Sequence, residues 1–442
     1  MNIYNTESNY YRMLVTRKLQ TCPDMSNLPS DKAIELRNFI NRLGNIYGTN
    51  FPNAKMMSPR LFGSIILCIT MLIMQGNGFI LIWPDILKIC NSILLESIAL
   101  QLMIRLFNRF VRDDENTTLL IQKSINIFYM REEKVIQNRI ALDSHIKTLK
   151  IALKAYLTIG LITYTVPSIS ALIYSMIYKE FFLFVPFYVP FTDPERFMFD
   201  FLLNTLILVL GSLLIGIIMI SGDLFNLYFI LQTIPMVNMI RIKIRNFGSE
   251  IEKFQETQRK KYNLFIKSIP SSSTKAKTLE IIFYKRHQQE LMKIEKHLVT
   301  VIQDSQNYDE YVKMNESFIE MTTFVAVSLN SLSMGLAILL AYIFSITIGV
   351  STFLLFFIEV LLPCLLGSIV SYQNEKLLKE FCSFPWYELS IPSQKIFLQH
   401  IHMCQNLAKL TVPIFGELEM ELFAQILNEA YAYLMFILNF VH

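Results

Sequence analysis

Apolar residues gather along the chain in seven long runs, which are separated in turn by basic segments and by connections that are short or apolar. A bilayer core about 30 Å thick is crossed by about 20 mostly apolar residues in helical form. The runs are too long and too uniformly apolar for the alternating strands of a barrel, so they predict an all-α membrane protein. The seven predicted transmembrane helices are Leu61–Trp83, Ile86–Phe107, Ala155–Tyr178, Phe199–Phe229, Ser317–Phe344, Ser351–Tyr372 and Leu418–Phe440.

The distribution of lysine and arginine predicts the orientation of these spans. Residues 1–60, 105–154, 240–316 and 373–412 hold 37 of the 40 Lys and Arg residues, and the alternate connections are short or apolar. Because cytoplasmic loops carry the excess of positive charge, we expect a cytoplasmic N-terminus, and seven spans then give an extracellular C-terminus. A G-protein-coupled receptor has the opposite orientation, which makes it the weaker alternative.

Two of the basic segments have helical periodicity of their own. Apolar positions recur at helical spacing in residues 121–156 and 277–303, and charged faces lie between them. We therefore expect cytoplasmic helical extensions of the spans within 105–154 and 240–316.

Residues 390–416 contain another helical pattern, which Pro413 and Gly416 interrupt before the last span. This pattern predicts a bent element in which a cytoplasmic helix joins a membrane helix. An ordinary amphipathic connector would give the same pattern.

The composition supports a membrane protein and argues against several other classes. Hydrophobic residues make up 53% of the chain and charged residues 17%, against about 25% charged residues in soluble domains. The net charge of +4 comes from the predicted cytoplasmic loops, so it indicates topology rather than nucleic-acid binding. The six cysteines form no paired pattern, and His400 and His402 would face nearly opposite sides of a helix. We therefore predict no enzyme, no metal site and no cofactor.

The last span combines apolar residues with a stripe of polar ones. At 100° per residue, one face about 100° wide collects carboxylates at its start, amides in its middle and an apolar step near its end. The residues of this stripe are Glu417, Glu421, Gln425, Asn428, Ala432, Met435, Phe436 and Asn439. Polar groups within hydrocarbon face a bundle interior or water, so the stripe fits the lining of a cation pore with an apolar gate. Hydrogen bonding to neighbouring helices of the same subunit is the other interpretation, and Glu429 at the edge of the stripe fits either.

The C-terminal region resembles the insect odorant receptors. The resemblance is carried by Trp386, the stretch SIPSQKIFLQHIHMCQNL, Pro413, Gly416, Phe423 and the stretch NEAYAYLMFIL. The stretch AYLMFILNF is also similar to a signature of the related gustatory receptors, but Ala432 replaces its Thr and Asn439 replaces its Gln. A gustatory receptor channel of the same architecture is therefore the alternative.

The resemblance implies an odorant-gated, nonselective cation channel in the plasma membrane of olfactory sensory neurons. In this family four subunits surround one pore lined by the last helix, and cytoplasmic helix ends form an anchor domain. The chain would then comprise a cytoplasmic segment 1–60, six spans within 61–372, an anchor region 373–413 and a pore helix 414–442. The family's gate, an apolar residue followed three positions later by an amide, matches Phe436 and Asn439, although Phe is larger than the usual aliphatic residue.

The loop before the fifth predicted span, residues 241–316, lacks the long insertion of the family's shared co-receptor. The resemblance therefore implies an odorant-tuning subunit that forms a heterotetramer with the odorant receptor co-receptor. The other expected partners are a small volatile apolar odorant, membrane lipid and permeating cations.

The family's odorant pocket lies in the outer half of the bundle, and it implies a mostly apolar site with one or two polar groups. Matched by depth, the candidates are Ile86, Ile89, Cys90, Ile93, Gly160, Tyr164, Pro167, Ser168, Leu202, Thr205, Leu206, Val209, Ser331, Gly335, Leu354, Phe357 and Ile358. Tyr164 stands out because a hydroxyl in mid-membrane needs a hydrogen-bond partner. Glu96 and Glu359 lie near the centres of the second and sixth spans, where acids are functional candidates, but the sequence names no partner for either.

Overall fold

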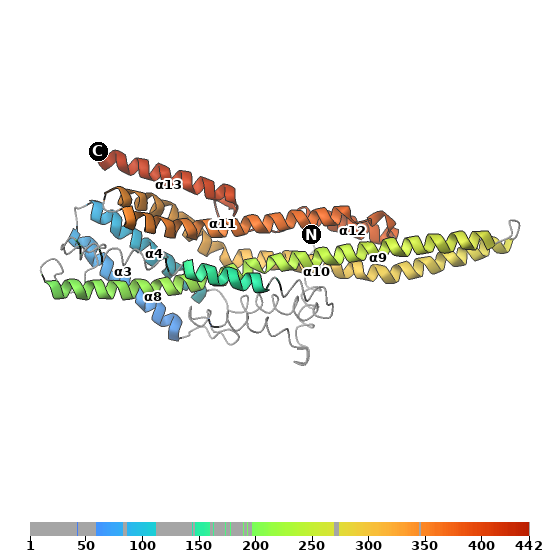
Figure 1. Ribbon diagram of the computed structural model, residues 1–442, viewed down its shortest axis with the longest axis horizontal. Coiled ribbons are helices and arrows are strands. Elements are labelled where there is room, and N and C mark those ends of the chain that lie inside the picture. Colours follow the sequence, from blue (N-terminus) through green and yellow to red (C-terminus); the bar gives the residue numbers. More distant parts are fainter. Residues whose placement is uncertain are drawn as a thin grey trace, which may run out of the picture.

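The computed structural model describes residues 59–82, 86–111, 146–159, 197–268, 274–343 and 346–441, together with positions 42, 144, 162, 173, 177, 189 and 192. This part of the chain is elongated and almost entirely helical, which confirms the predicted all-α class (Figure 1). The larger helices are α3 (Pro59–Ile82), α4 (Ile86–Val111), α8 (Met198–Leu231), α9 (Thr233–Ser268), α10 (Thr274–Ile343), α11 (Ile346–Ser383), α12 (Ile391–Cys404) and α13 (Met420–Val441). The small elements are the 3-10 helix η1 (Trp386–Glu388) and the strands β1 (Thr411–Val412) and β2 (Gly416–Glu417), and residues 146–159 form a further helix.

Apart from Leu418 and Glu419, which precede α13, the predicted apolar runs lie within these helices wherever the structure describes them. α3, α4, α8 and α13 each begin and end within a few residues of a predicted span. The third span, Ala155–Tyr178, falls mostly outside the described residues. By length and composition, three stretches of the described chain could cross a membrane: Met198–Ile266, Ile281–Leu339 and Thr352–Ser383.

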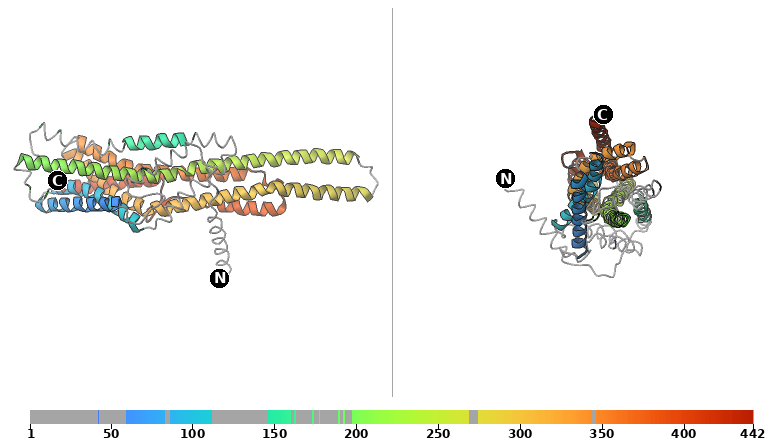
Figure 2. Two further views of the ribbon diagram at one scale, coloured as in Figure 1. Left: turned by 90° about the horizontal axis from the view of Figure 1, so that it is seen from below. Right: turned by 90° about the vertical axis from the view of Figure 1, so that its left-hand side faces the viewer.

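α10 is a single helix of 70 residues that joins two regions of the molecule. Its first half runs beside α9, and the pair extends well beyond the other helices (Figure 1, Figure 2). Its second half lies in the bundle and contacts α4, α11 and α13. At 1.5 Å per residue this helix is about 105 Å long. The predicted cytoplasmic helix at 277–303 is therefore continuous with the predicted span that follows it.

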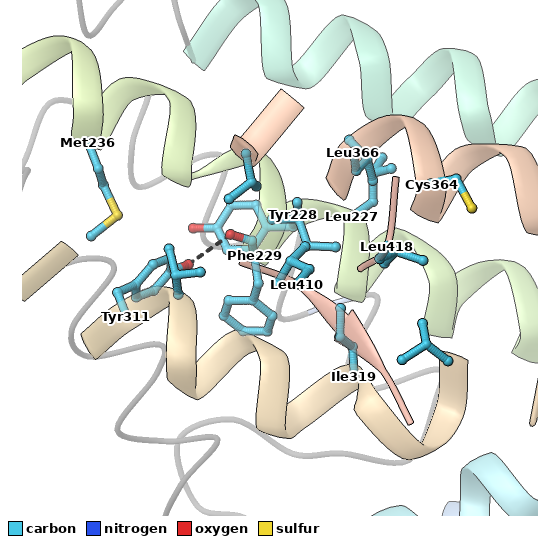
Figure 3. Packing of buried hydrophobic residues seen from close by; sticks show 14 of the residues in the cluster. Leu227, Tyr228, Phe229, Met236, Tyr311, Ile319, Cys364, Leu366, Leu410 and Leu418 are labelled. Atoms are coloured by element: carbon cyan, nitrogen blue, oxygen red, sulfur yellow. Dashed lines mark hydrogen bonds between the residues drawn. The ribbon is translucent and has the colours of Figure 1, made fainter. Parts of the chain in front are cut away.

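α8 and α9 follow one another with a break at Gln232, where Pro235 removes a helical hydrogen-bond donor. The Phe229 carbonyl near this break accepts a hydrogen bond from the Tyr311 hydroxyl at 3.0 Å (Figure 3). It accepts a second hydrogen bond from the Asn315 amide at 3.3 Å. Because α10 supplies these donors, the break leaves the carbonyl paired although it is buried.

A β-hairpin, not a simple bend, connects α12 to α13. Thr411 pairs with Glu417 and Val412 pairs with Gly416. Gly416 has a φ of 90°, which glycine adopts without strain, and Ile414 at the tip has a φ of 72°. A positive φ at a β-branched residue is strained by about 1–3 kcal/mol, so the surrounding structure must impose this turn.

The hairpin is fixed at the centre of the molecule. Leu410 and Leu418, which flank it, are 3% and 0% exposed. The Leu418 N–H donates a hydrogen bond to the Leu410 carbonyl at 2.8 Å, and both side chains lie among core residues of α8, α10 and α11 (Figure 3). The start of α13 is therefore tied to the core of the bundle.

Candidate functional site

α13 is amphipathic, and its apolar face packs on α10 and α11. Leu422, Phe423, Ile426 and Ala430 are buried there. The opposite face is exposed in the single chain, and it carries the predicted stripe residues Glu421, Gln425, Asn428, Ala432, Met435, Phe436 and Asn439. Because α13 lies at the outer edge of the bundle, this face is available to water or to another subunit (Figure 1, Figure 2).

The polar residues of the stripe do not link α13 to other helices of the same chain. Among the described residues, Glu421, Gln425, Asn428 and Asn439 make no side-chain hydrogen bond or ion pair. A polar side chain at membrane depth without an internal partner requires water or a neighbouring subunit. The arrangement therefore favours a surface that meets water or another subunit over packing within one subunit. Glu429 is exposed as well, so it shares this surface.

The prediction that Glu417 belongs to the helical stripe is wrong, because α13 begins only at Met420. Glu417 lies in β2, and its carboxylate forms an ion pair with the Lys409 ammonium at 2.6 Å. Glu419 accepts a hydrogen bond from the Ser371 hydroxyl at 2.6 Å. These two acids therefore attach the start of α13 to the linker and to α11.

Two glycines allow α13 to approach its neighbours closely. A Cβ on Gly335 of α10 would lie 2.8 Å from the Ala430 carbonyl oxygen. A Cβ on Gly367 of α11 would overlap the Leu418 carbonyl oxygen. Any larger residue at either position would have to displace α13 or the helix that carries the glycine.

A carboxylate of α10 holds the beginning of α12. Glu295 is 6% exposed, and it accepts hydrogen bonds from the Ser390 N–H at 2.6 Å, the Ser390 hydroxyl at 2.7 Å and the Ser393 hydroxyl at 2.8 Å. Ser390 is the N-cap residue of α12. A negative charge at this end of a helix also interacts favourably with the helix dipole.

Two further carboxylates of α10 hold the linker that leads to α13. Asp309 accepts a hydrogen bond from the Ala408 N–H at 2.7 Å, and Glu316 accepts one from the Thr411 hydroxyl. Glu295, Asp309 and Glu316 are separated by multiples of seven residues, a spacing that keeps them on one side of a helix. We call these three residues the α10 carboxylate row, and it fixes the segment between α11 and α13 along α10.

Buried polar side chains join α4, α10 and α11 inside the bundle. The Ser97 and Ser333 hydroxyl oxygens lie 2.9 Å apart. The Gln101 amide donates to the Asn330 side-chain oxygen at 2.5 Å, and the Asn330 amide donates to the Glu359 carboxylate at 3.1 Å. Asn330 is therefore one partner of Glu359, for which the sequence named none.

Further along α4, a buried ion pair joins this helix to α8. Arg105 and Asp223 are 2.6 Å apart, and the Tyr156 hydroxyl donates to Asp223 at 3.1 Å. These three side chains and Glu359 line a cavity of about 40 Å³, which is large enough for ordered water. Glu96, the other acid predicted near the centre of a span, is half-buried on α4.

The candidate odorant residues fall into three groups. The first group lies outside the described residues or has side chains that are not described: Gly160, Tyr164, Pro167, Ser168, Ile86, Ile89 and Cys90. Leu202, Leu206 and Leu354 are 50%, 57% and 44% exposed on the outside of the chain, which corrects the prediction that they line an internal pocket. The third group is buried or half-buried in the bundle: Ile93, Thr205, Val209, Ser331, Gly335, Phe357 and Ile358.

Two of these interior candidates contact α13. Gly335 lies against the Ala430 backbone, as described above. Phe357 packs edge-on against Phe423, with 5.2 Å between the ring centroids. Residues predicted from family depth to meet an odorant are therefore in direct contact with the last helix.

Sequence reasoning missed the α10 carboxylate row and the Arg105–Asp223 pair. A signal for the first was the seven-residue spacing of acids along one long helical pattern. A signal for the second was the spacing of Ser97, Gln101 and Arg105, which are four residues apart within an apolar span. Neither spacing identifies the partner helix.

His400 and His402 occupy different environments on α12. His400 is buried, with its Nε2 3.3 Å from the Cys404 sulfur and its ring edge-on to Phe381, and His402 is exposed. Burial lowers the pKa of His400 to about 4 and raises the pKa of Cys404 to about 12, so both are neutral near pH 7. No cluster of metal-ligating side chains is found within the described ranges.

Comparison with known proteins gives consistent matches. Residues 117–431 match the family described as 7tm odorant receptor. The chain is 22% identical over 187 residues to the putative odorant receptor 83c of Drosophila melanogaster, and the match spans 41% of each chain, less than half of that relative. The fold is similar to the insect olfactory receptor OR5 from Machilis hrabei, with a TM-score of 0.62, 16% identity and coverage of 92% of this chain and 99% of that one. The structure of OR5 in complex with eugenol gives a TM-score of 0.58, 17% identity and coverage of 92% and 100%.

Proposed function

The chain belongs to the 7tm odorant receptor family, and we propose that it is the odorant-binding subunit of a heteromeric, odorant-gated, nonselective cation channel. Membership of this family favours an odorant receptor over a gustatory receptor. A solved structure of similar fold is a complex with eugenol, which supports a small volatile odorant as the ligand of this chain. The proposed partner is the shared co-receptor of the family, in a heterotetramer.

The observation that carries this proposal is the exposed polar stripe of α13. Glu421 attracts cations near the start of the helix, and the amides of Gln425 and Asn428 can replace part of a cation's hydration shell. Phe436 and Asn439 form the apolar gate and the amide beyond it. Because the stripe lies on the outside of one chain, a pore forms only when several subunits bring their α13 helices together.

The odorant pocket is proposed to lie among α4, α8, α10 and α11, near Ile93, Val209, Ser331, Phe357 and Ile358. A ligand opens a channel only if it binds the open state better than the closed state. Since α10 and α11 carry pocket candidates and also contact α13, a shift of either helix on odorant binding moves the pore helix. Tyr164 remains the proposed polar contact of the odorant.

We propose that the chain crosses the plasma membrane of olfactory sensory neurons seven times, with its N-terminus in the cytoplasm. The basic α9–α10 pair would then project into the cytoplasm. A tag at each terminus, probed with antibody on intact cells, tests this orientation. Labelling of an N-terminal tag together with protection of a C-terminal tag would contradict it and would favour the G-protein-coupled alternative.

Electrophysiology tests the channel proposal. The chain is expressed alone and with the co-receptor, and currents are recorded with a panel of volatile odorants. We expect odorant-evoked current from the pair, and we expect Glu421→Ala and Asn439→Ala to change relative cation permeability or block. Glu375→Ala and Gln303→Ala are matched controls, because both residues are exposed away from α13. The proposal would be contradicted if the chain and the co-receptor reached the surface normally but gave no odorant-evoked current. Unchanged cation permeation in both stripe variants would contradict it as well.

A further inference from the structure

The cavity of about 40 Å³ beside the Arg105–Asp223 ion pair lies inside the bundle, where five helices meet. Its polar wall consists of Arg105 of α4, Tyr156 of the helix 146–159, Asp223 and Asn226 of α8, Thr322 and Thr323 of α10, and Glu359 of α11. Leu227, Ile319 and Leu366, which Figure 3 labels, belong to its apolar wall. None of the described candidate odorant residues is among those that line it, so this cavity is distinct from the proposed odorant pocket.

The charged groups of the polar wall are mainly negative. One guanidinium and two carboxylates give the wall a net charge of −1 when all three are ionised. Arg105 and Asp223 form an ion pair at 2.6 Å, and Glu359, which is only 8% exposed, is the second carboxylate. The Tyr156 hydroxyl interacts electrostatically with all three charged side chains, so the charges converge on the same space. A net negative charge buried in this way is costly unless a positive charge balances it.

The hydroxyl groups of the wall present oxygen lone pairs to the cavity, because their hydrogens are used elsewhere. The Tyr156 hydroxyl donates to Asp223 at 3.1 Å. The hydroxyls of Thr322 and Thr323 both donate to the Ile319 carbonyl, at 2.8 Å and 2.9 Å. Since a hydroxyl has a single hydrogen, each of these three oxygens can only accept from an occupant of the cavity. The wall therefore suits a cation and does not suit an anion.

We propose that this cavity binds a monovalent alkali cation, Na⁺ or K⁺. The carboxylate and hydroxyl oxygens replace part of the hydration shell of the ion. The cavity has room for such an ion together with about one or two waters. One positive charge balances the charge of the wall, whereas a divalent ion would leave a buried excess of positive charge.

The bound ion also stabilises the packing of the bundle. Asp223, Thr323 and Glu359 come from α8, α10 and α11, so one ion contacts three helices at once. A ligand that binds the folded protein and not the unfolded chain stabilises the fold as its concentration rises. Both ion binding and thermal unfolding therefore report on the site.

Binding of radioactive sodium ion to the purified full-length chain tests the site directly. Scintillation proximity is measured in N-methyl-D-glucamine chloride, which keeps the ionic strength constant with a cation too large for the cavity. We expect saturable binding of one Na⁺ per chain, and unlabelled Na⁺ or K⁺ should displace it more effectively than Ca²⁺. Absence of saturable binding at neutral pH would overturn the proposal, and a proton on Glu359 would then balance the charge. Stronger displacement by Ca²⁺ would overturn it as well.

Two variants of the wall and one control locate the ion. Glu359→Gln retains an acceptor for the Asn330 amide but removes the negative charge, so it should weaken Na⁺ binding by roughly 100-fold or more. Thr323→Val keeps all three charges and should weaken Na⁺ binding about tenfold, which keeps the proposal testable if the first variant fails to fold. Glu375→Gln removes an exposed carboxylate of α11 and should leave Na⁺ binding unchanged. Wild-type affinity in both wall variants would overturn the proposal.

A variant of the polar stripe distinguishes this cavity from the proposed pore. Glu421→Gln should leave Na⁺ binding unchanged, and loss of binding in this variant but not in Glu359→Gln would place the ion in the pore and overturn the proposal. The midpoint of thermal unfolding should rise when Na⁺ replaces N-methyl-D-glucamine in wild type and in Glu375→Gln, but not in Glu359→Gln. An equal rise in all three would contradict the site. None of these readouts requires odorant-evoked current, so failure here leaves the channel proposal standing.

Discussion

Gly335 on α10 lies so close to Ala430 on α13 that a Cβ on the glycine would come within 2.8 Å of the alanine carbonyl oxygen. At this separation the two helices have no side chain between them that could absorb a displacement. A change in the position of α10 must therefore reach the last helix at this point.

Gly335→Ala should alter gating, because the added methyl group forces α10 and α13 apart. Overpacking of this kind costs about 1–3 kcal/mol, so the half-maximal odorant concentration should shift roughly five-fold or more, or a leak current should appear. Dose–response curves from cells that express the variant with the co-receptor provide the measurement. Gly63→Ala is the control, since a Cβ there meets nothing within 4 Å. Identical curves for Gly335→Ala and wild type would show that the close contact has no role in gating.

Loss of the Asp309 carboxylate should loosen the linker before α13. Asp309→Ala leaves the Ala408 N–H without its partner, at a cost of about 1–3 kcal/mol in the free energy of unfolding. We expect a lower midpoint of thermal unfolding in detergent and a smaller odorant-evoked current per channel at the surface. Glu256→Ala, at an exposed acid on α9, should change neither quantity. A wild-type melting temperature in the Asp309 variant would mean that the α10 carboxylate row does not stabilise the linker.

Replacing one partner of the Arg105–Asp223 ion pair should destabilise the protein more than replacing both partners with apolar residues. Arg105→Met leaves a largely buried aspartate without its counter-charge, at a cost of about 3–5 kcal/mol. The double variant Arg105→Met with Asp223→Leu removes both charges of this pair and should recover much of the lost stability. Thermal unfolding of the purified chains and their surface expression are the two measurements. A double variant that is as unstable as the single one would indicate that the pair, or water in its cavity, has a role beyond charge compensation.

His400 should make the protein less stable in mild acid. Burial holds its pKa in the folded protein at about 4, below the ordinary value near 6.5. Between these two values the unfolded chain binds a proton that the folded protein does not, so stability falls as the pH drops from about 6.5 to about 4. Melting temperatures from pH 7.5 to pH 5 should therefore decline less in His400→Leu than in wild type. His402→Leu, which changes an exposed histidine of the same helix, should decline as wild type does.

The sequence predicted the features that depend on local periodicity. The bounds of α4 and α8 differ little from the predicted spans because an apolar run of membrane length has few other conformations available. The exposed stripe from Glu421 to Asn439 also follows from the angular positions of residues on one helix. Such properties belong to a single element and require no knowledge of its neighbours.

The errors concern relations between elements. Glu417 was assigned to the helix because two-residue strands have no detectable period, so the hairpin before α13 left no trace in the pattern. Leu202 and Leu206 were matched to the family's pocket by their depth along the span, and depth does not tell which face of an all-apolar helix such as α8 points inward. The Asn330–Glu359 bond joins two helices whose relative rotation only tertiary packing defines.

Because α10 is one continuous helix, a small tilt at one end gives a larger displacement at the other. Gly335, near one end of α10, contacts the last helix. Glu295, which is hydrogen-bonded to the start of α12, lies 40 residues away, about 60 Å along the helix axis. A tilt of α10 by only about 2° around Gly335 would move Glu295 by about 2 Å, since the two residues are about 60 Å apart. A small adjustment among side chains of the bundle would thus displace the start of α12 by more than the length of a covalent bond. A small rearrangement near Gly335 would therefore be amplified along α10 before it reaches Glu295.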